Sequence, residues 1–258
     1  MAEPHALLKV MTFNIRYGTA EDGPNSWAFR RDSALQLLRD SDCAVIGMQE
    51  VLAGQLNEIL SELPYMRSIG VGRDDGAAEG EFNPILYDAR MVELIDSETF
   101  WFSDTPQIPG SSTWGNINIR ICTRGSFLFG GREFEIYNLH IDHEVELSRQ
   151  KSIELLAQRV ASSPLDRPVL VTGDFNAGEA SEPVAMMHAA GFVDTYRSIY
   201  TDLAESATYH GWADLYDGEK IDYIFAMGEV EVIDAAIVRD KPFSRFPSDH
   251  YAVTAVVR

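Results

Sequence analysis

The clearest signal in this chain is the stretch Val169-Leu170-Val171-Thr172-Gly173-Asp174-Phe175-Asn176. Its first four residues are mostly apolar and β-branched, a composition that predicts a short strand buried in the core. The strand then ends on a carboxylate and an amide that stand two residues apart. Taken alone, these two side chains are also compatible with an ordinary turn.

Polar side chains end, interrupt or, at residues 248–250, open an apolar strand in five more places. These runs lie at residues 10–14, 45–50, 137–140, 220–225 and 248–250. Individually, their polar residues read equally well as turn residues, a helix cap, a strand histidine or surface ion pairs. A sheet, however, brings its strand ends together at one rim, so the whole set can converge. Carboxylate and amide oxygens suit a hard divalent cation, and the set as a whole suits phosphoryl transfer.

Short β-rich runs recur along the chain, several with the two-residue alternation of half-buried strands. They lie at residues 7–15, 43–48, 82–87, 91–102, 118–129, 133–141, 169–172, 221–226, 230–238 and 251–257. Helical patterns lie at residues 27–38, 53–63, 144–160 and 183–190. This mixture predicts two packed sheets with helices on their outer faces. No linker or repeat divides the chain, so we expect a single domain over residues 1–258.

The composition limits the classes of function. The chain has 258 residues, 45% of them hydrophobic and 24% charged, which suits a globular protein with a substantial core. No stretch approaches the roughly 18 apolar residues that span a membrane, and no secretion signal is evident, so we expect a cytoplasmic protein. A net charge of −19 disfavours a dedicated binder of nucleic acid. Cys43 and Cys122 lie in apolar runs, and we expect two buried thiols.

In their order and residue sequence, these motifs resemble those of the endonuclease/exonuclease/phosphatase superfamily. This superfamily includes deoxyribonuclease I, apurinic endonucleases, inositol polyphosphate 5-phosphatases, bacterial sphingomyelinases and deadenylases. The resemblance runs from Thr12-Phe13-Asn14 to Ser248-Asp249-His250, and Gly173-Asp174-Phe175-Asn176 is among its most specific parts. It implies an α/β fold, the deoxyribonuclease I-like four-layer α/β/β/α sandwich of two mixed sheets. The chain is most similar to a compact bacterial branch of largely unassigned substrate.

The resemblance also implies a metal site. Glu50 matches the principal Mg²⁺ ligand of the superfamily, for which Mn²⁺ is a possible substitute. Asn14 and Asp249 match residues at or near the metal. We therefore expect these three side chains to surround one divalent cation.

The remaining core residues match groups that carry out the chemistry. Asp174 matches the carboxylate that orients and deprotonates the attacking water, and Asn176 matches the amide that holds the nucleophile or the phosphate. His250 matches a phosphate-binding histidine, and Asp222 the carboxylate that fixes its tautomer and charge. His140 matches a second histidine that faces the phosphate, and we expect its protonated form to stabilise the growing negative charge.

Substrate contacts are expected outside these motifs. Arginine and histidine side chains suit a second anionic group and tryptophans suit stacking on a ring, whereas the alternative for each is an ordinary ion pair or core packing. The candidates are Arg31, Arg73, Trp114, Arg120 and His210, together with Trp27 and Trp212. Arg120 is the strongest, because it lies on the strand predicted before the hairpin partner that carries His140. Arg124 stands where the family pattern has an aromatic residue, which leaves its role open.

We therefore expect a metal-dependent phosphatase or phosphodiesterase that acts on a small phosphorylated metabolite, without a membrane or an obligate protein partner. Three alternatives remain open. The first is a nuclease that acts on DNA or RNA. The second is a zinc hydrolase of the metallo-β-lactamase type, because residues 138–143 lack only the first histidine of that signature. The third is a non-catalytic binding module, although no chemical group of the family is missing.

Overall fold

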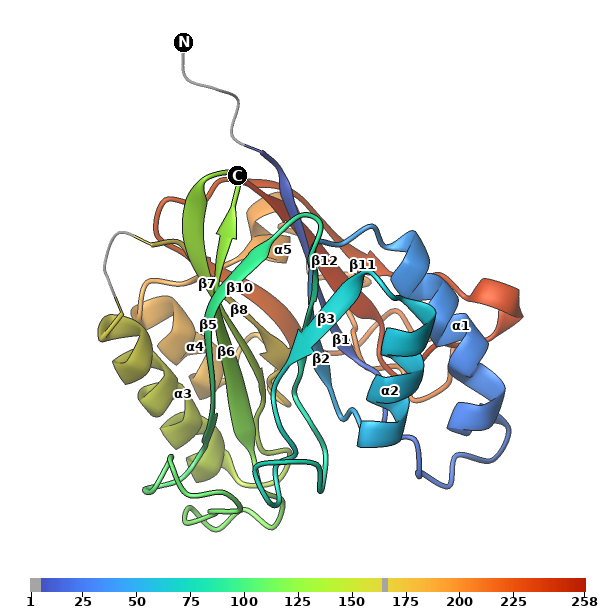
Figure 1. The fold of residues 1–258 in the computed structure, drawn as a ribbon, viewed down its shortest axis with the longest axis horizontal. Coiled ribbons are helices and arrows are strands. Elements are labelled where there is room, and N and C mark those ends of the chain that lie inside the picture. Colours follow the sequence, from blue (N-terminus) through green and yellow to red (C-terminus); the bar gives the residue numbers. More distant parts are fainter. Residues whose placement is uncertain (1–5, 164–166) are drawn as a thin grey trace.

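The computed structural model describes residues 6–163 and 167–258, which form two six-stranded sheets packed face to face (Figure 1). The first sheet consists of β1 (Leu8–Asn14), β2 (Val45–Gln49), β3 (Met66–Ile69), β4 (Ile85–Asp88), β11 (Val232–Val238) and β12 (Ala252–Val257), in the order β11-β12-β1-β2-β4-β3. The second consists of β5 (Glu93–Trp101), β6 (Ile121–Phe129), β7 (Arg132–His140), β8 (Val169–Asp174), β9 (Val193–Asp194) and β10 (Asp222–Met227), in the order β5-β6-β7-β8-β10-β9. Both sheets mix parallel and antiparallel pairs.

Helices cover the outer faces of the two sheets, so the molecule has four layers (Figure 1). The longer helices are α1 (Trp27–Asp40) and α2 (Ala53–Glu62) on the first sheet, and α3 (Glu146–Ala161) and α4 (Glu182–Ala189) on the second. The short α5 (Thr195–Ile199) packs against β10 and β11. Apolar clusters fill the space under each pair of helices and the space between the sheets. The predicted four-layer α/β/β/α sandwich is therefore confirmed.

Near one rim, the interface between the sheets is polar. Asn138 of the second sheet donates to the carbonyl oxygen of Met48 at 2.7 Å and accepts from Gln49 at 2.7 Å. Gly47 allows this close approach, since a Cβ there would lie 2.1 Å from Thr172 Oγ1. This polar seam fixes how the two sheets sit against each other at the rim where the site residues lie.

The predicted elements agree with the structure except at their ends and in the shortest segments. β4 begins at Ile85, because Phe82 makes only isolated bridges, with Val51 and Gly72. The pattern missed β3 and β9, which have four and two residues. It also missed α5, whose Thr, Tyr and Ile residues favour strands. The helix forms there because the Asp194 side chain accepts the backbone N–H groups of Tyr196 and Arg197.

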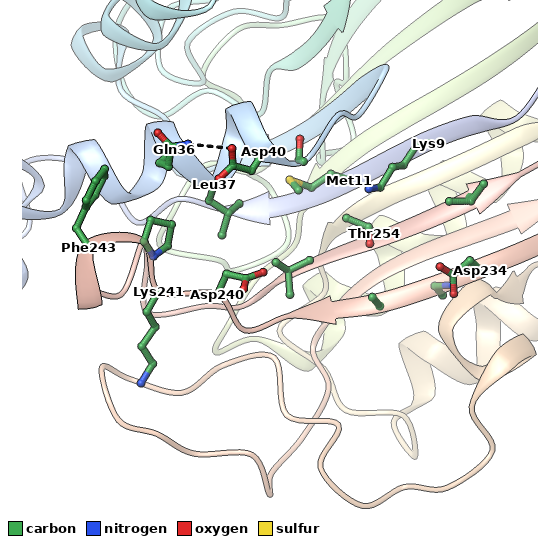
Figure 2. A pocket seen from close by; sticks show the side chains of 16 residues that line it. Lys9, Met11, Gln36, Leu37, Asp40, Asp234, Asp240, Lys241, Phe243 and Thr254 are labelled. Atoms are coloured by element: carbon green, nitrogen blue, oxygen red, sulfur yellow. Dashed lines mark hydrogen bonds between the residues drawn. The ribbon is translucent and has the colours of Figure 1, made fainter.

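Beside α1, part of the outer face of the first sheet is open. A hollow of about 790 Å³ lies there between α1, β11, β12 and the 3₁₀ turn η2 (Pro242–Ser244) (Figure 2). Figure 2 shows that its charged side chains are spread around the hollow and do not converge on one point. Asp40 is hydrogen-bonded to Gln36 at 2.8 Å, and Lys241 contacts Asp214. None of the predicted site residues lines this hollow.

Candidate active site

Strand register brings the predicted residues of the second sheet to one rim. β7 and β8 are parallel, and their register pairs His140 with Asp174. β8 and β10 are antiparallel, and their register pairs Asp174 with Asp222. Asp174 therefore lies between a histidine and a second carboxylate on three adjacent strands. All three side chains are buried.

The first sheet supplies the opposite half of the site. Asn14 ends β1 and Glu50 follows β2, the parallel neighbour of β1. The Asn14 amide donates to Glu50 Oε1 and to Asp174 Oδ2, both at 3.0 Å, so it links carboxylates of the two sheets. Its own oxygen accepts the backbone N–H of Arg16 at 3.0 Å. Asp249 precedes β12, on the other side of β1, and burial raises the pKa of its carboxyl group.

Left-handed backbone conformations gather at this rim. Arg16, Glu50 and Asn176 have φ values of 60°, 60° and 44°. Such strain costs a residue with a side chain on the order of 1–3 kcal/mol and persists where the surroundings hold it. Local bonds hold it here: Glu50 Oε2 accepts the N–H of Tyr17 at 3.1 Å, and Asp174 Oδ1 accepts the N–H of Asn176 at 2.8 Å. The strained turns direct the side chains that follow the strands into one pocket.

His140 is a neutral hydrogen-bond acceptor in this structure. The Asn176 Nδ2 atom lies 3.0 Å from the carbonyl oxygen of Ile141, which identifies it as the donor, and it lies 2.9 Å from His140 Nε2. Nε2 therefore accepts, and the ring proton is on Nδ1. Burial, followed by the positive charges of Arg120 and Arg73, lowers the pKa of His140 well below its ordinary value. This describes the protein without substrate, and the role of a protonated His140 in stabilising the growing negative charge stays a prediction.

His250 has the opposite electrostatic environment. Its Nδ1 lies 2.9 Å from Asp222 Oδ2, and its Nε2 faces Asp174 Oδ2 at 3.8 Å. Burial alone would lower the pKa of His250, but the charge and hydrogen bond of Asp222 raise it well above its ordinary value. Burial and the charge of Asp222 also raise the pKa of Asp174. The rim therefore holds one charged and one neutral histidine on either side of a carboxylate.

Most of these side chains line a pocket of about 450 Å³, whereas Asn14 and Asp222 are buried and do not line it. Of the predicted substrate contacts, Arg73 and Arg120 line this pocket. Residues that the sequence did not single out also line it, among them Arg16, Tyr17, Glu81, Asn118 and Tyr209. The Tyr209 ring packs edge-on against His250 with ring centroids 5.0 Å apart and remains half exposed.

The other three predicted substrate contacts lie outside this pocket. Arg31 is on the surface of α1, where it pairs with Asp32 and Glu58. Trp114 is buried in the core under α3, and its indole N–H donates to Asp104 at 2.8 Å. His210 is buried between aromatic rings, with centroid distances of 4.5 Å to Phe246 and 4.2 Å to Tyr251. The structure therefore gives none of these three a place against a substrate in the pocket.

Arg30, the neighbour of Arg31, supports the site from behind. Its buried guanidinium donates to the carbonyl oxygens of Ile15, Arg16, Asn25 and Pro247 at 2.6, 2.7, 2.9 and 2.9 Å. It also lies over the rings of Trp27 and Trp212, which accounts for those two predicted aromatic contacts. A signal for Arg30 was present in the sequence: it shares a helix face with Trp27, Ala34 and Leu37, and a cation on a buried face needs partners.

Arg124 makes a structural ion pair. It contacts Glu135 on the neighbouring strand and donates to Asp96 at 2.7 Å. At this position, where the family pattern has an aromatic residue, the chain thus has an arginine that pairs with two carboxylates. It does not line the pocket.

The zinc alternative finds no support in the geometry of residues 138–143. Asp142 Oδ1 accepts the backbone N–H groups of Glu144 and Val145, and His143 Nδ1 lies 2.8 Å from Arg120 Nη2. Within the described ranges, the cluster of His and carboxylate donors close enough to share an ion is instead Asp174, Asp222 and His250.

The two cysteines agree with the sequence expectation. Cys43 and Cys122 are free and buried, and burial raises the pKa of Cys43 to about 11, which makes it a poor nucleophile. Across the parts of the chain that the structure describes, no helix has both the length and the apolar character that crossing a membrane requires.

Several known proteins are similar to this chain in fold, and some of them also in sequence. The family model described as "Endonuclease/Exonuclease/phosphatase family" matches residues 11–250. An endonuclease/exonuclease/phosphatase from Bacteroides vulgatus is 33% identical, with a TM-score of 0.91 over 98% of this chain and 99% of that one. A mannosyl-6-phosphatase from Bacteroides thetaiotaomicron is 28% identical, with a TM-score of 0.90 over 97% and 99%. The human Nocturnin catalytic domain, 17% identical with a TM-score of 0.78 over 98% and 94%, shares the fold. This chain belongs to the endonuclease/exonuclease/phosphatase family.

Proposed function

We propose that this chain, with residues 1–258 as one catalytic domain, is a Mg²⁺-dependent phosphoester hydrolase that acts on a small phosphorylated metabolite. Members of the family hydrolyse phosphoester bonds and generally depend on a divalent metal. The observation that carries the proposal is the position of Asp174. This buried carboxylate is linked to Glu50 through Asn14, and its Oδ2 lies 3.7 and 3.8 Å from the two histidines. Such a carboxylate is placed to orient a water molecule at a phosphorus atom.

Glu50 and Asp249 fit a hard divalent cation. Burial raises the pKa of Asp249, and the charge of Glu50 adds to that effect, so the two carboxylates crowd negative charge that a cation between them would neutralise. Their donors are oxygens, which Mg²⁺ prefers, and Mn²⁺ accepts the same ligands. Asn14 would hold Glu50 in place from the side. When bound, the cation supplies Lewis-acid polarisation of the P–O bond and neutralises the leaving oxygen.

The protein side chains divide the remaining work. Asp174 orients the attacking water and accepts its proton, and its raised pKa brings it closer to the range that suits a general base near neutral pH. The backbone N–H of Asn176 holds Asp174 Oδ1, and the Asn14 amide holds Oδ2 between the two histidines. His250, held charged by Asp222, offers Nε2–H to a phosphate oxygen where negative charge grows. His140 faces the same carboxylate from the other side and keeps Asn176 oriented.

A small substrate is favoured over a nucleic acid for two reasons. The pocket measures about 450 Å³, and the net charge of −19 gives the molecule a field that repels a long polyanion. The similarity to a mannosyl-6-phosphatase supports a phosphorylated sugar or a related metabolite. A nuclease remains the competing activity within the same chemistry.

The proposal is tested by hydrolysis of 4-nitrophenyl phosphate and bis(4-nitrophenyl) phosphate by metal-stripped protein, with and without added Mg²⁺. We expect Mg²⁺-dependent turnover that EDTA abolishes. Asp174→Asn should lower kcat by about 10²-fold or more. Asp32→Asn, which changes an exposed carboxylate on α1, is the matched control and should retain full activity. Absence of turnover on both compounds, or wild-type turnover in Asp174→Asn, would contradict the proposal. Preferential cleavage of plasmid DNA would favour the nuclease.

A further inference from the structure

One wall of the pocket carries two arginines that the proposed hydrolysis does not use. Arg120 precedes β6, and Arg73 lies in the loop after β3; both line the pocket that contains Asp174. The Arg120 side chain is only 4% exposed. The Nε atoms of both arginines are buried and have no hydrogen-bond partner among the described residues. Leaving a buried charged donor unpaired is costly, so these two N–H groups point to a missing acceptor.

The neighbouring carboxylates do not supply that acceptor. Arg120 Nε lies 3.8 Å from Asp142, whose other oxygen is already bonded to backbone N–H groups at the start of α3. Arg73 donates through Nη1 to Glu81 at 2.7 Å, but its Nε is 3.8 Å from Asp74. The two guanidinium groups are also close enough to repel each other: burial, followed by the charge of Arg73, lowers the pKa of Arg120. An anion bound beside the two guanidinium groups would offset this repulsion.

Strand order places this wall away from the reacting phosphate. β6 pairs with β7, and extending the register Cys122↔Leu139 sets Ile121 opposite His140 and Arg120, which precedes the strand, opposite Ile141. On its other side, His140 pairs with Asp174 of β8. The backbone of Arg120 is thus about two strand spacings, roughly 10 Å, from that of Asp174. The guanidinium contacts Asp142 and His143, which also lie past His140. The Arg120 guanidinium therefore contacts groups beyond His140, although the charge of Asp174 still acts on it.

We propose that Arg73 and Arg120 form a second anion subsite, which binds a phosphate or carboxylate group of the substrate other than the phosphate that is cleaved. The forked guanidinium suits two-pronged contact with either group. The inference rests on the proposed function for its catalytic half. It narrows the substrate class to small molecules with two anionic groups, one at Asp174 and one at the arginine wall.

The test compares glucose 6-phosphate, 6-phosphogluconate and glucose 1,6-bisphosphate, which share one phosphate position and end in a neutral, a carboxylate or a phosphate group. We expect kcat/KM to be at least about tenfold higher for one of the two doubly anionic compounds than for glucose 6-phosphate, as one charge-assisted contact allows. Arg73→Gln and Arg120→Gln should each reduce this ratio to near one. Arg73 is the less buried of the two, so its variant remains informative if Arg120→Gln does not fold. Arg39→Gln, a surface arginine paired with Glu62, should keep the wild-type ratio.

A binding measurement separates this inference from the proposed function. The same compounds are titrated calorimetrically into Asp174→Asn protein with Mg²⁺, alone and combined with Arg73→Gln. Tighter binding of a doubly anionic compound that disappears with Arg73→Gln would support the subsite even if no compound is hydrolysed. A ratio near one in the wild-type protein together with equal binding of all three compounds would overturn it. Equal loss of activity on all three compounds in the arginine variants would also overturn it, because the arginines would then contact the cleaved phosphate.

Discussion

Replacing Arg30 with methionine should destabilise the protein and weaken its activity together, whereas the same change at Arg31 should do neither. Arg30 is buried and joins the carbonyl oxygens of Ile15 and Arg16, just after Asn14, to that of Pro247, two residues before Asp249. Arg31 points away from the core and pairs only with surface carboxylates. The two arginines are adjacent in sequence and identical in chemistry, so the comparison isolates what the buried bonds do.

The size of the effect follows from the contacts. A hydrogen bond from a charged donor contributes about 1.5–3 kcal/mol, so the four bonds of Arg30 represent roughly 6–12 kcal/mol before opposing costs. Burial lowers the pKa of Arg30 to about 10. That lowering corresponds to roughly 3 kcal/mol spent on keeping the charge inside the protein, which methionine recovers. Water also reaches some of the released carbonyl groups. We expect a net loss of about 3–5 kcal/mol, or about 10 °C in Tm for a chain of this length.

Activity should fall with stability, because Arg30 holds the two segments that carry Asn14 and Asp249. Misplacing such groups by about 1 Å costs up to 10²-fold in rate, so we expect kcat/KM to drop by about tenfold to a hundredfold at a temperature where the variant remains folded. Denaturant unfolding and initial rates measure the two effects. Arg30→Lys should fall in between, since an ammonium has fewer donors than a guanidinium. If Arg30→Met and Arg31→Met both change the free energy of unfolding by less than about 0.5 kcal/mol, the reasoning is refuted.

Three further predictions concern other buried ionisable groups. Asp222→Asn should lower kcat by about 10²-fold, because it removes the negative charge that keeps the His250 ring protonated. The Tm should change little, since the amide oxygen can still accept a hydrogen bond from His250. Wild-type rates would contradict this prediction. Lys220→Met should lower the free energy of unfolding by about 3–5 kcal/mol, since Asp194 would stay buried without the ammonium group 2.6 Å away, and denaturant unfolding should register the loss. Burial lowers the pKa of His210 to about 4, so between about pH 6.5 and this value the unfolded chain binds a proton that the folded one does not, and stability falls as pH falls. His210→Phe should therefore show a smaller drop in Tm from pH 7 to pH 4.5 than the wild-type protein, and equal drops would rule the explanation out.

The geometry of the site core was predictable because strand ends and polar residues coincide in the sequence. Asn14, Glu50, His140 and Asp174 each end an apolar run or directly follow one, and parallel pairing of two strand pairs is enough to bring them to one rim. The charge on His140 was not predictable. It depends on Arg120 and Arg73, which are distant in sequence and meet the histidine only after folding.

The residues around the core were predicted less well, for a physical reason. The sequence does not show which group an arginine side chain will contact in the folded protein. Neighbouring side chains on a helix also point to different faces. Arg31 was therefore chosen although Arg30 is the buried one. In the loop that follows α5, His210 was chosen although Tyr209 lines the pocket, because an irregular loop has no periodicity from which direction can be read.

The division of the site between two sheets explains why its supporting bonds run between them. The proposed metal ligands Glu50 and Asp249 belong to the first sheet and Asp174 belongs to the second, so no single strand or loop sets the distance between them. That distance depends on the packing of the sheets, which the polar seam at Gly47 and Asn138 fixes near the rim. Asn14 then spans the remaining gap with one bond to each half. A site held by bonds between two packed sheets suits the proposed positioning of a water molecule against phosphorus, because that chemistry depends on fixed geometry.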